Sequence, residues 1–197
     1  MTKSILQRWS RASKFAAATA ALALAATSAT AAIVATAGAA VQIAPPPSVE
    51  LNQLQSNVNL FAFNERQCFW LNVPLQTDQG AIPAFTKMSS HFVSGDPNTT
   101  LLLTGRVRFD AQIIGVISTT AGLDASDASC GAPGTVYPTG VEPNRGFEPS
   151  PPQADSYQII AGGFGIQVTM DVPPLSFSDH LRVLTRCECD GDVCGGD

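Results

Sequence analysis

The sequence predicts an all-β protein, an antiparallel and jelly-roll-like β-sandwich that follows an N-terminal signal segment. Short apolar runs rich in Val, Ile and Phe recur along the chain, and Gly, Pro and Asp residues that favour turns separate them. After residue 40, no segment keeps the helical apolar period of about 3.6 residues over more than about ten residues. Without the signal segment about 160 residues remain, a length that suits one domain with a sizeable core.

Residues 1–40 have the order of a secretory signal, with basic residues first, an almost uncharged Ala-rich run next and small residues at the end. The basic residues are Lys3, Arg8, Arg11 and Lys14. The pairs Ala35/Ala37 and Ala37/Ala39 fit the A-x-A rule, so we expect Sec-dependent export with cleavage between Ala37 and Ala40. An uncleaved run of about 20 apolar residues would instead anchor the chain in a membrane.

The exported part is acidic. Removal of the signal takes four of the 11 basic residues and none of the 16 acidic residues, so the formal net charge changes from −5 to −9. Nucleic-acid binding depends on Lys and Arg side chains that neutralise phosphates, so this balance argues against a nucleic-acid partner.

The exported part divides into three segments. Residues 41–55 are a Pro-rich entry segment, 56–186 the sandwich domain, and 187–197 a tail rich in Cys, Asp and Gly. Strands are expected at 57–64, 67–73, 89–95, 101–110, 111–119, 156–162, 164–172 and 180–186. The exception within the domain is 122–155, which has six prolines and little strand pattern, and which we expect to be a long loop.

All five cysteines lie in the exported part, where an oxidising compartment allows disulfides to persist: Cys68, Cys130, Cys187, Cys189 and Cys194. The number is odd, and spacing alone does not give the pairing. The preferred hypothesis is that Cys68 and Cys130 join within the domain while two of the three tail cysteines pair locally.

The stretch 122–140 contains the first candidate site. Asp124, Ser126 and Asp127 could bind calcium with the help of loop carbonyls, because Ca²⁺ prefers oxygen ligands. The alternative, which we favour, is that both aspartates cap local turns by accepting backbone N–H groups.

Two further sets of residues are candidates for ligand contact. Arg145 and Glu148 flank Gly146 in the long loop, where they would bind a polar ligand or, more commonly, form an ion pair that clamps the loop. Trp70, Tyr137 and Tyr157 are the aromatic residues available for stacking on a sugar.

Several motifs occur in a fixed order along 48–186: Ile-Gly-Val-Ile, Leu-Asp-x-Ser-Asp, Pro-Gly-x-x-Tyr-Pro-Thr-Gly, Arg-Gly-x-Glu and a final Arg-Val strand. In this combination the chain resembles a family of secreted bacterial β-rich proteins. Many of its members carry a C-terminal PEP-CTERM sorting tail and are linked to exosortase systems and extracellular polysaccharide. This chain ends in RCECDGDVCGGD instead of that tail, so the resemblance implies a freely secreted or matrix-bound protein and no particular reaction.

Signal, acidity and resemblance together predict a non-enzymatic extracellular or cell-surface protein with a structural or adhesive role. Its expected partners are extracellular polysaccharide or other surface proteins, and calcium is the one cofactor that the sequence suggests. Two alternatives stay open: a carbohydrate-binding module, and a secreted hydrolase that uses carboxylates of the 122–155 loop.

Overall fold

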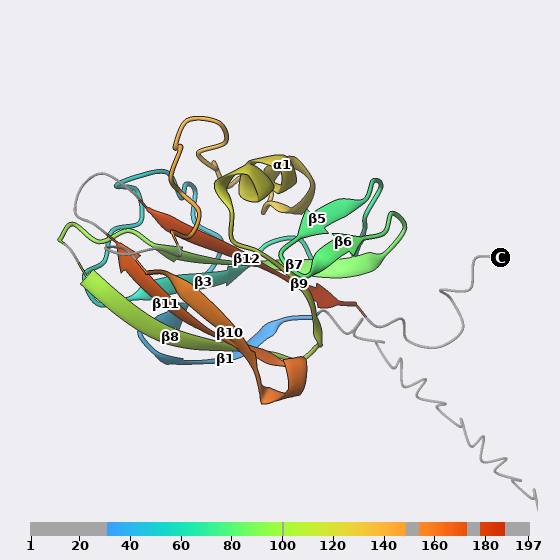
Figure 1. The fold of residues 1–197 in the computed structure, drawn as a ribbon, viewed down its shortest axis with the longest axis horizontal. Helices are drawn as coiled ribbons and strands as arrows, with labels where there is room; N and C mark the ends of the chain where they lie inside the picture. Colours follow the sequence, from blue (N-terminus) through green and yellow to red (C-terminus); the bar gives the residue numbers. More distant parts are fainter. Residues whose placement is uncertain (1–30, 100, 149–153, 173–177, 188–197) are drawn as a thin grey trace, which may run out of the picture.

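The computed structural model describes residues 31–99, 101–148, 154–172 and 178–187. Two β-sheets stack face to face, and one α-helix with a small hairpin lies on the outer side of the larger sheet (Figure 1). The predicted all-β sandwich is confirmed. Among the described residues, no helix has the length and apolar character needed to cross a membrane.

The smaller sheet has four antiparallel strands, in the spatial order β1-β8-β11-β10. Their bounds are β1 Ile33–Gly38, β8 Leu101–Phe109, β10 Ser156–Ile160 and β11 Gly165–Val172, and the short 3₁₀ turn Ala161–Gly163 joins the last two. Alternate residues of β8 and β11 point into the sandwich, as the two-residue period of a half-buried strand requires.

The larger sheet has the order β2-β3-β7-β12-β9, with β4 also paired to β7. Its strands are β2 Ala40–Gln42, β3 Leu60–Asn64, β4 Phe69–Trp70, β7 Lys87–Gly95, β9 Ile113–Ile117 and β12 Asp179–Arg186. The β2–β3 pair is parallel, and the other pairs are antiparallel. A separate hairpin is formed by β5 Leu75–Thr77 and β6 Gly80–Ile82.

Strand β12 is covered on both faces. One apolar cluster fills the space between the sheets and includes Leu181 and Val183, while a second cluster on the outer side of the larger sheet includes Leu184. Seven of the eight residues of β12 are therefore buried. Polar residues of this strand need partners inside the protein, because water does not reach them.

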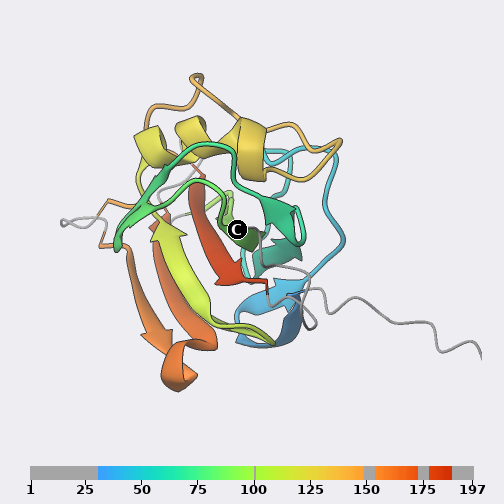
Figure 2. The ribbon, with the colours of Figure 1, turned by 90° about the vertical axis from the view of Figure 1, so that its right-hand side faces the viewer.

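The helix α1, Thr120–Cys130, occupies the start of the segment that we expected to be a loop, so that expectation is wrong for these residues. The Thr119 side chain caps the helix by accepting the N–H of Gly122, and Gly131 ends it. Figure 2 shows α1 and the chain that follows it lying over the larger sheet, on the side away from the smaller one.

The expected boundary at residue 40 is also wrong. Strand β1 pairs with β8, and after a turn at Gly38 the chain crosses to the other sheet, where β2 pairs with β3. The sandwich therefore includes Ile33–Gly38 and Ala40–Gln42, which we had assigned to the signal and the entry segment. Cleavage between Ala37 and Ala40 would remove β1 from its sheet.

The expected Cys68–Cys130 bridge is wrong as well. Cys68 forms a disulfide with Cys187, with 5.3 Å between the Cα atoms, and Cys130 is a buried free cysteine. Phe69 follows Cys68, and Arg186 precedes Cys187. Both are register partners of Met88 in β7, which brings the two cysteines together. Cys189 and Cys194 lie outside the described residues.

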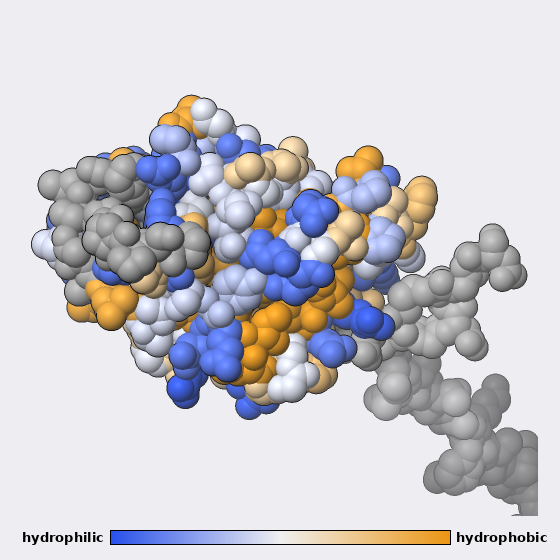
Figure 3. Space-filling model, in the orientation of Figure 1, coloured by the Kyte–Doolittle hydropathy of each residue, from blue (hydrophilic) through white to orange (hydrophobic). Residues whose placement is uncertain are grey.

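The face seen in Figure 3 is mainly polar, with isolated apolar areas. In the view of Figure 3 an apolar area lies over β10 and β9, the edge strands of the two sheets. Ile159 of β10 and Phe164 before β11 are 36% and 40% exposed, respectively.

Candidate functional site

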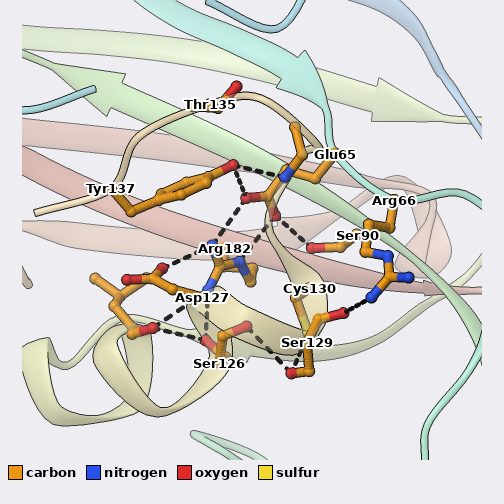
Figure 4. Close-up of polar contacts among 12 residues, drawn as sticks. Glu65, Arg66, Ser90, Ser126, Asp127, Ser129, Cys130, Thr135, Tyr137 and Arg182 are labelled. Carbon is orange, nitrogen blue, oxygen red and sulfur yellow. Dashed lines mark hydrogen bonds and ion pairs between the residues drawn. The ribbon is translucent and has the colours of Figure 1, made fainter. Parts of the chain in front are cut away.

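A buried network of charged side chains joins the larger sheet to α1 (Figure 4), and Arg182 of β12 is its centre. Arg182 donates from Nε and Nη2 to the two carboxylate oxygens of Glu65, at 2.8 Å each. Nη2 also donates to Asp127 Oδ1 at 3.0 Å. The guanidinium lies over the rings of Phe92 and Tyr137, 5.2 Å and 5.4 Å from their centroids.

Glu65 follows β3 and is 6% exposed. Besides Arg182, it accepts hydrogen bonds from the Tyr137 hydroxyl at 2.6 Å and from the Ser90 hydroxyl at 2.5 Å. Burial and the Glu65 charge raise the pKa of Tyr137 above its ordinary value. Burial alone would lower the pKa of Arg182, but the charge of Glu65 and its hydrogen bonds raise it above the ordinary value. The network thus stabilises the charged guanidinium and the neutral phenol.

Asp124, Ser126 and Asp127 do not form a calcium loop or cap turns, because they lie on α1 and face arginines. Arg145 Nη2 donates to both carboxylate oxygens of Asp127, at 2.9 Å and 2.8 Å, and Arg145 Nε lies 3.2 Å from Asp124 Oδ1 in an ion pair. The Ser126 hydroxyl accepts from Arg182 Nη1. Two guanidinium groups stand where a cation would have to bind, so the proposed calcium site is wrong.

The chain around Arg145 is held tightly against the start of α1. Phe147 N donates to the Ser118 carbonyl at 2.7 Å, and Gly146 N donates to Thr120 Oγ1 at 3.0 Å. A Cβ atom on Gly146 would lie 2.3 Å from Thr120 N, so only glycine fits at this close approach. The local geometry explains why a glycine follows Arg145.

The network pairs acids with bases and is largely buried, so its evident role is to fasten α1 and the following chain onto β12. Arg145 and Arg182 are both 0% exposed. Cys130, at the end of α1, is buried beside them, and burial raises the pKa of its thiol. A buried thiol that stays protonated is a poor nucleophile.

The three aromatic candidates are not gathered on one face. Trp70 in β4 is 50% exposed, and it lines a groove that also includes Arg66, Asn72 and Ser129. Tyr137 belongs to the buried network. Tyr157 in β10 is partly buried, donates to Asp78 Oδ2 at 3.0 Å and packs near Phe147. Of the three, Trp70 is the residue available for stacking on a ligand.

A second polar site lies at one end of the sandwich. Glu148, Asp155 and Asp179 each offer a carboxylate oxygen, and these oxygens all lie within 4.8 Å of one another. Burial and the charges of Asp155 and Glu148 raise the pKa of Asp179 to about 9. Burial and the Asp155 charge raise the pKa of Glu148 to about 7. The predicted Arg145–Glu148 ion pair is therefore wrong, because the two side chains belong to different sites.

This acidic cluster bears on the hydrolase hypothesis. Glu148 and Asp155 come from the 122–155 segment and are close enough for a carboxylate pair. However, Asp155 and Asp179 are only 5% and 0% exposed, so the cluster is closed to a polymeric substrate. Its donor set of three carboxylates is that of a site for a hard cation.

Sequence reasoning missed Glu65, Asp155, Asp179 and Arg182. The available signal was a charged residue within or at the edge of an apolar strand pattern, as in DHLRVLTR, since such a residue needs a buried partner when both faces are covered. No protein-family model, curated protein or solved structure matches the chain.

Proposed function

We propose that this chain is an exported β-sandwich protein with a structural or adhesive role at the cell surface or in the extracellular matrix. The observation that carries the proposal is the Cys68–Cys187 disulfide, which joins cysteines 119 residues apart in a chain whose first residues resemble a secretory signal. Disulfides of this kind persist in oxidising compartments and are rare in the cytosol. The resemblance to secreted PEP-CTERM-type proteins supports the same location.

A cut that leaves the sandwich intact lies before β1. Ala29 and Ala31 satisfy the A-x-A rule, so cleavage after Ala31 would leave all of β1 in the mature chain. In the structure Ala32 N donates to Asp110 Oδ1 at 2.6 Å. Cleavage at this bond would turn that amide into an α-ammonium group beside a carboxylate, which favours the ion pair.

A mechanical or adhesive role also fits the use of charge inside the protein. The four ion pairs among described residues tie Arg145 and Arg182 to acids on α1 and at the end of β3. Together with the Cys68–Cys187 disulfide, these ion pairs connect α1, the long segment and the strands β3, β4 and β12. A rigid scaffold of this kind presents its surface loops in a fixed arrangement.

Export and retention test this proposal. The full chain, expressed in a bacterium with a Sec system, should appear in the periplasm or medium without its leader, and it should sediment with extracellular matrix. Recovery of the unprocessed chain in the cytosol, or an exported chain that never associates with matrix or cell surface, would contradict it.

A carbohydrate-binding role is the second candidate, and the groove at Trp70 favours it. The half-exposed Trp70 lines this groove together with Asn72 and Arg66, and the Arg66 guanidinium donates to the Ser129 carbonyl at 2.9 Å. An aromatic face beside hydrogen-bonding groups is suited to a sugar ring. Trp70→Ala should abolish sedimentation with polysaccharide, whereas Phe85→Ala, at another exposed aromatic, should not. Equal binding by both variants would exclude the groove.

A further inference from the structure

The acidic cluster brings together two distant parts of the chain. Glu148 and Asp155 flank the segment 149–153, and Asp179 is the first residue of β12. The backbone holds the first two together, because Asp155 N donates to the Glu148 carbonyl at 3.0 Å and Glu148 N donates to Asp155 Oδ2 at 2.9 Å. The N–H of Asp171 in β11 donates to Asp155 Oδ1 at 2.7 Å.

Asp155 is therefore oriented before any ligand binds. Each of its oxygens accepts one backbone N–H and keeps further lone-pair capacity, since a carboxylate oxygen can accept more than one interaction. The same contacts fix the backbone of Glu148, from which its carboxylate extends. Asp179 of β12 lies beside this pair.

Asp179 supplies the independent observation. Its side chain is 0% exposed, and no donor group among the described residues hydrogen-bonds to either of its carboxylate oxygens. It nevertheless points at the oxygens of Glu148 and Asp155, within 4.8 Å. A buried carboxylate without a partner is strongly unfavourable, and neighbouring negative charges make it more so.

The nearby bases do not relieve this repulsion. The ion pairs of the described residues assign Arg145 to Asp124 and Asp127, and Arg182 to Glu65 and Asp127. Neither guanidinium forms an ion pair with the acidic cluster. Protons or a bound cation must therefore neutralise the cluster, and the raised pKa values of Asp179 and Glu148 reflect the same repulsion.

We propose that Glu148, Asp155 and Asp179 bind one Ca²⁺ ion. Ca²⁺ takes oxygen ligands at about 2.3–2.6 Å, so ligand oxygens on opposite sides of the ion lie about 4.6–5.2 Å apart, and the cluster fits within that span. Mg²⁺ requires near-ideal octahedral geometry at about 2.0–2.1 Å and usually keeps several waters, so a set of three protein carboxylates suits Ca²⁺ better. Thiolate and imidazole ligands, which favour zinc, are not part of the cluster.

A bound Ca²⁺ would join the end of the long segment to β12 and, through Asp155, to β11. The ion would thus fasten both sheets at one end of the sandwich. Extracellular modules commonly bind Ca²⁺ with Kd values of about 10⁻⁴–10⁻³ M, which matches the outer milieu of a cell. The inference concerns this site alone and stands whether or not the protein is adhesive.

Calorimetric titration of the full exported and oxidised chain with CaCl₂, after chelator treatment and at neutral pH, tests the proposal. We expect one ion per chain from these residues. We also expect a rise in Tm of about 5–10 °C when Ca²⁺ is about 100-fold above Kd. Glu148→Gln, Asp155→Asn and Asp179→Asn should each weaken binding by at least about tenfold, and MgCl₂ should give a smaller response.

Asp96→Asn is the matched control, because Asp96 is 3% exposed, has an unpartnered oxygen and lies outside the cluster. This variant should keep the full calcium response. Two results would overturn the proposal. Absence of heat and of a Tm shift at about 10 mM Ca²⁺ would mean that protons neutralise the cluster. An equal response in the wild type and all three cluster variants would place the ion elsewhere, for instance on the acidic tail.

Discussion

Replacement of Arg182 by Met removes the guanidinium at the centre of the buried network and keeps much of its volume. Glu65 then loses both charge-assisted hydrogen bonds at 2.8 Å, and Asp127 loses one at 3.0 Å. Breaking a buried ion pair from one side typically costs about 3–5 kcal/mol, because a charge is left unpaired. The free energy of unfolding of a natural protein is typically about 10 kcal/mol, so this cost is about a third of it or more.

Urea denaturation followed by circular dichroism measures this loss. Arg182→Met should lower the free energy of unfolding by about 3–5 kcal/mol and Tm by on the order of 10 °C. Arg186→Met is the matched control, because Arg186 ends the same strand and is exposed, and its effect should stay within about 0.5 kcal/mol. A loss below about 1 kcal/mol in Arg182→Met would refute the view that the network holds α1 on the sheet.

A second variant separates the lost charge from lost packing. In Glu65→Gln/Arg182→Met the carboxylate left alone by Arg182→Met is neutral, while Asp127 keeps Arg145. The double variant should therefore be more stable than the sum of the two single effects by about 1–3 kcal/mol. Strict additivity would mean that the two side chains act independently.

Three further predictions concern other parts of the fold. Cys68→Ser should lower the free energy of unfolding by about 2–5 kcal/mol, towards the upper end because the bridged cysteines are 119 residues apart, and an effect absent under oxidising conditions would contradict the bridge. Burial lowers the pKa of His91 to about 3, whereas the unfolded chain titrates near its ordinary value of about 6.5. Stability is then complete above about pH 6.5 and falls as the pH decreases towards 3, by on the order of 2 kcal/mol at about pH 5, and urea midpoints of His91→Gln should show a flatter pH dependence. Gly146→Ala should lower Tm clearly, because its Cβ would lie 2.3 Å from Thr120 N, and an unchanged Tm would show that this contact yields easily.

The sequence was informative about strands with a regular apolar pattern. The expected runs at 57–64, 89–95, 101–110, 164–172 and 180–186 contain β3, β7, β8, β11 and β12 almost entirely. These segments are rich in β-branched and aromatic residues and bounded by turn formers, which is the pattern that periodicity detects best.

The missed elements lack that pattern for physical reasons. The inward face of α1 consists of Leu123, Ser126, Asp127 and Cys130, so its helical period is carried mainly by polar residues that meet arginines. The β1 and β2 segments are rich in Ala and continue the composition of the signal segment without a break. A hydrophobicity pattern cannot separate such elements from a loop or a leader.

The candidate site was predicted only in part. Asp127 and Arg145 were singled out separately, and the structure shows them in contact. Their further partners, Glu65 and Arg182, lie 62 residues before Asp127 and 37 residues after Arg145, in strands that the fold brings together. Contacts between distant segments depend on strand order, which one sequence does not contain, and the disulfide partner of Cys68 was missed for the same reason.

We propose that the chain is exported and that the Cys68–Cys187 disulfide forms on export. Intact mass and N-terminal sequencing of the protein recovered outside the cytosol test this directly, with alkylation before and after reduction. We expect a chain that begins at Ala32, with Cys68 and Cys187 protected from alkylation until reduction. A chain that keeps residues 1–31 and stays in the cytosol with Cys68 freely alkylated would contradict it.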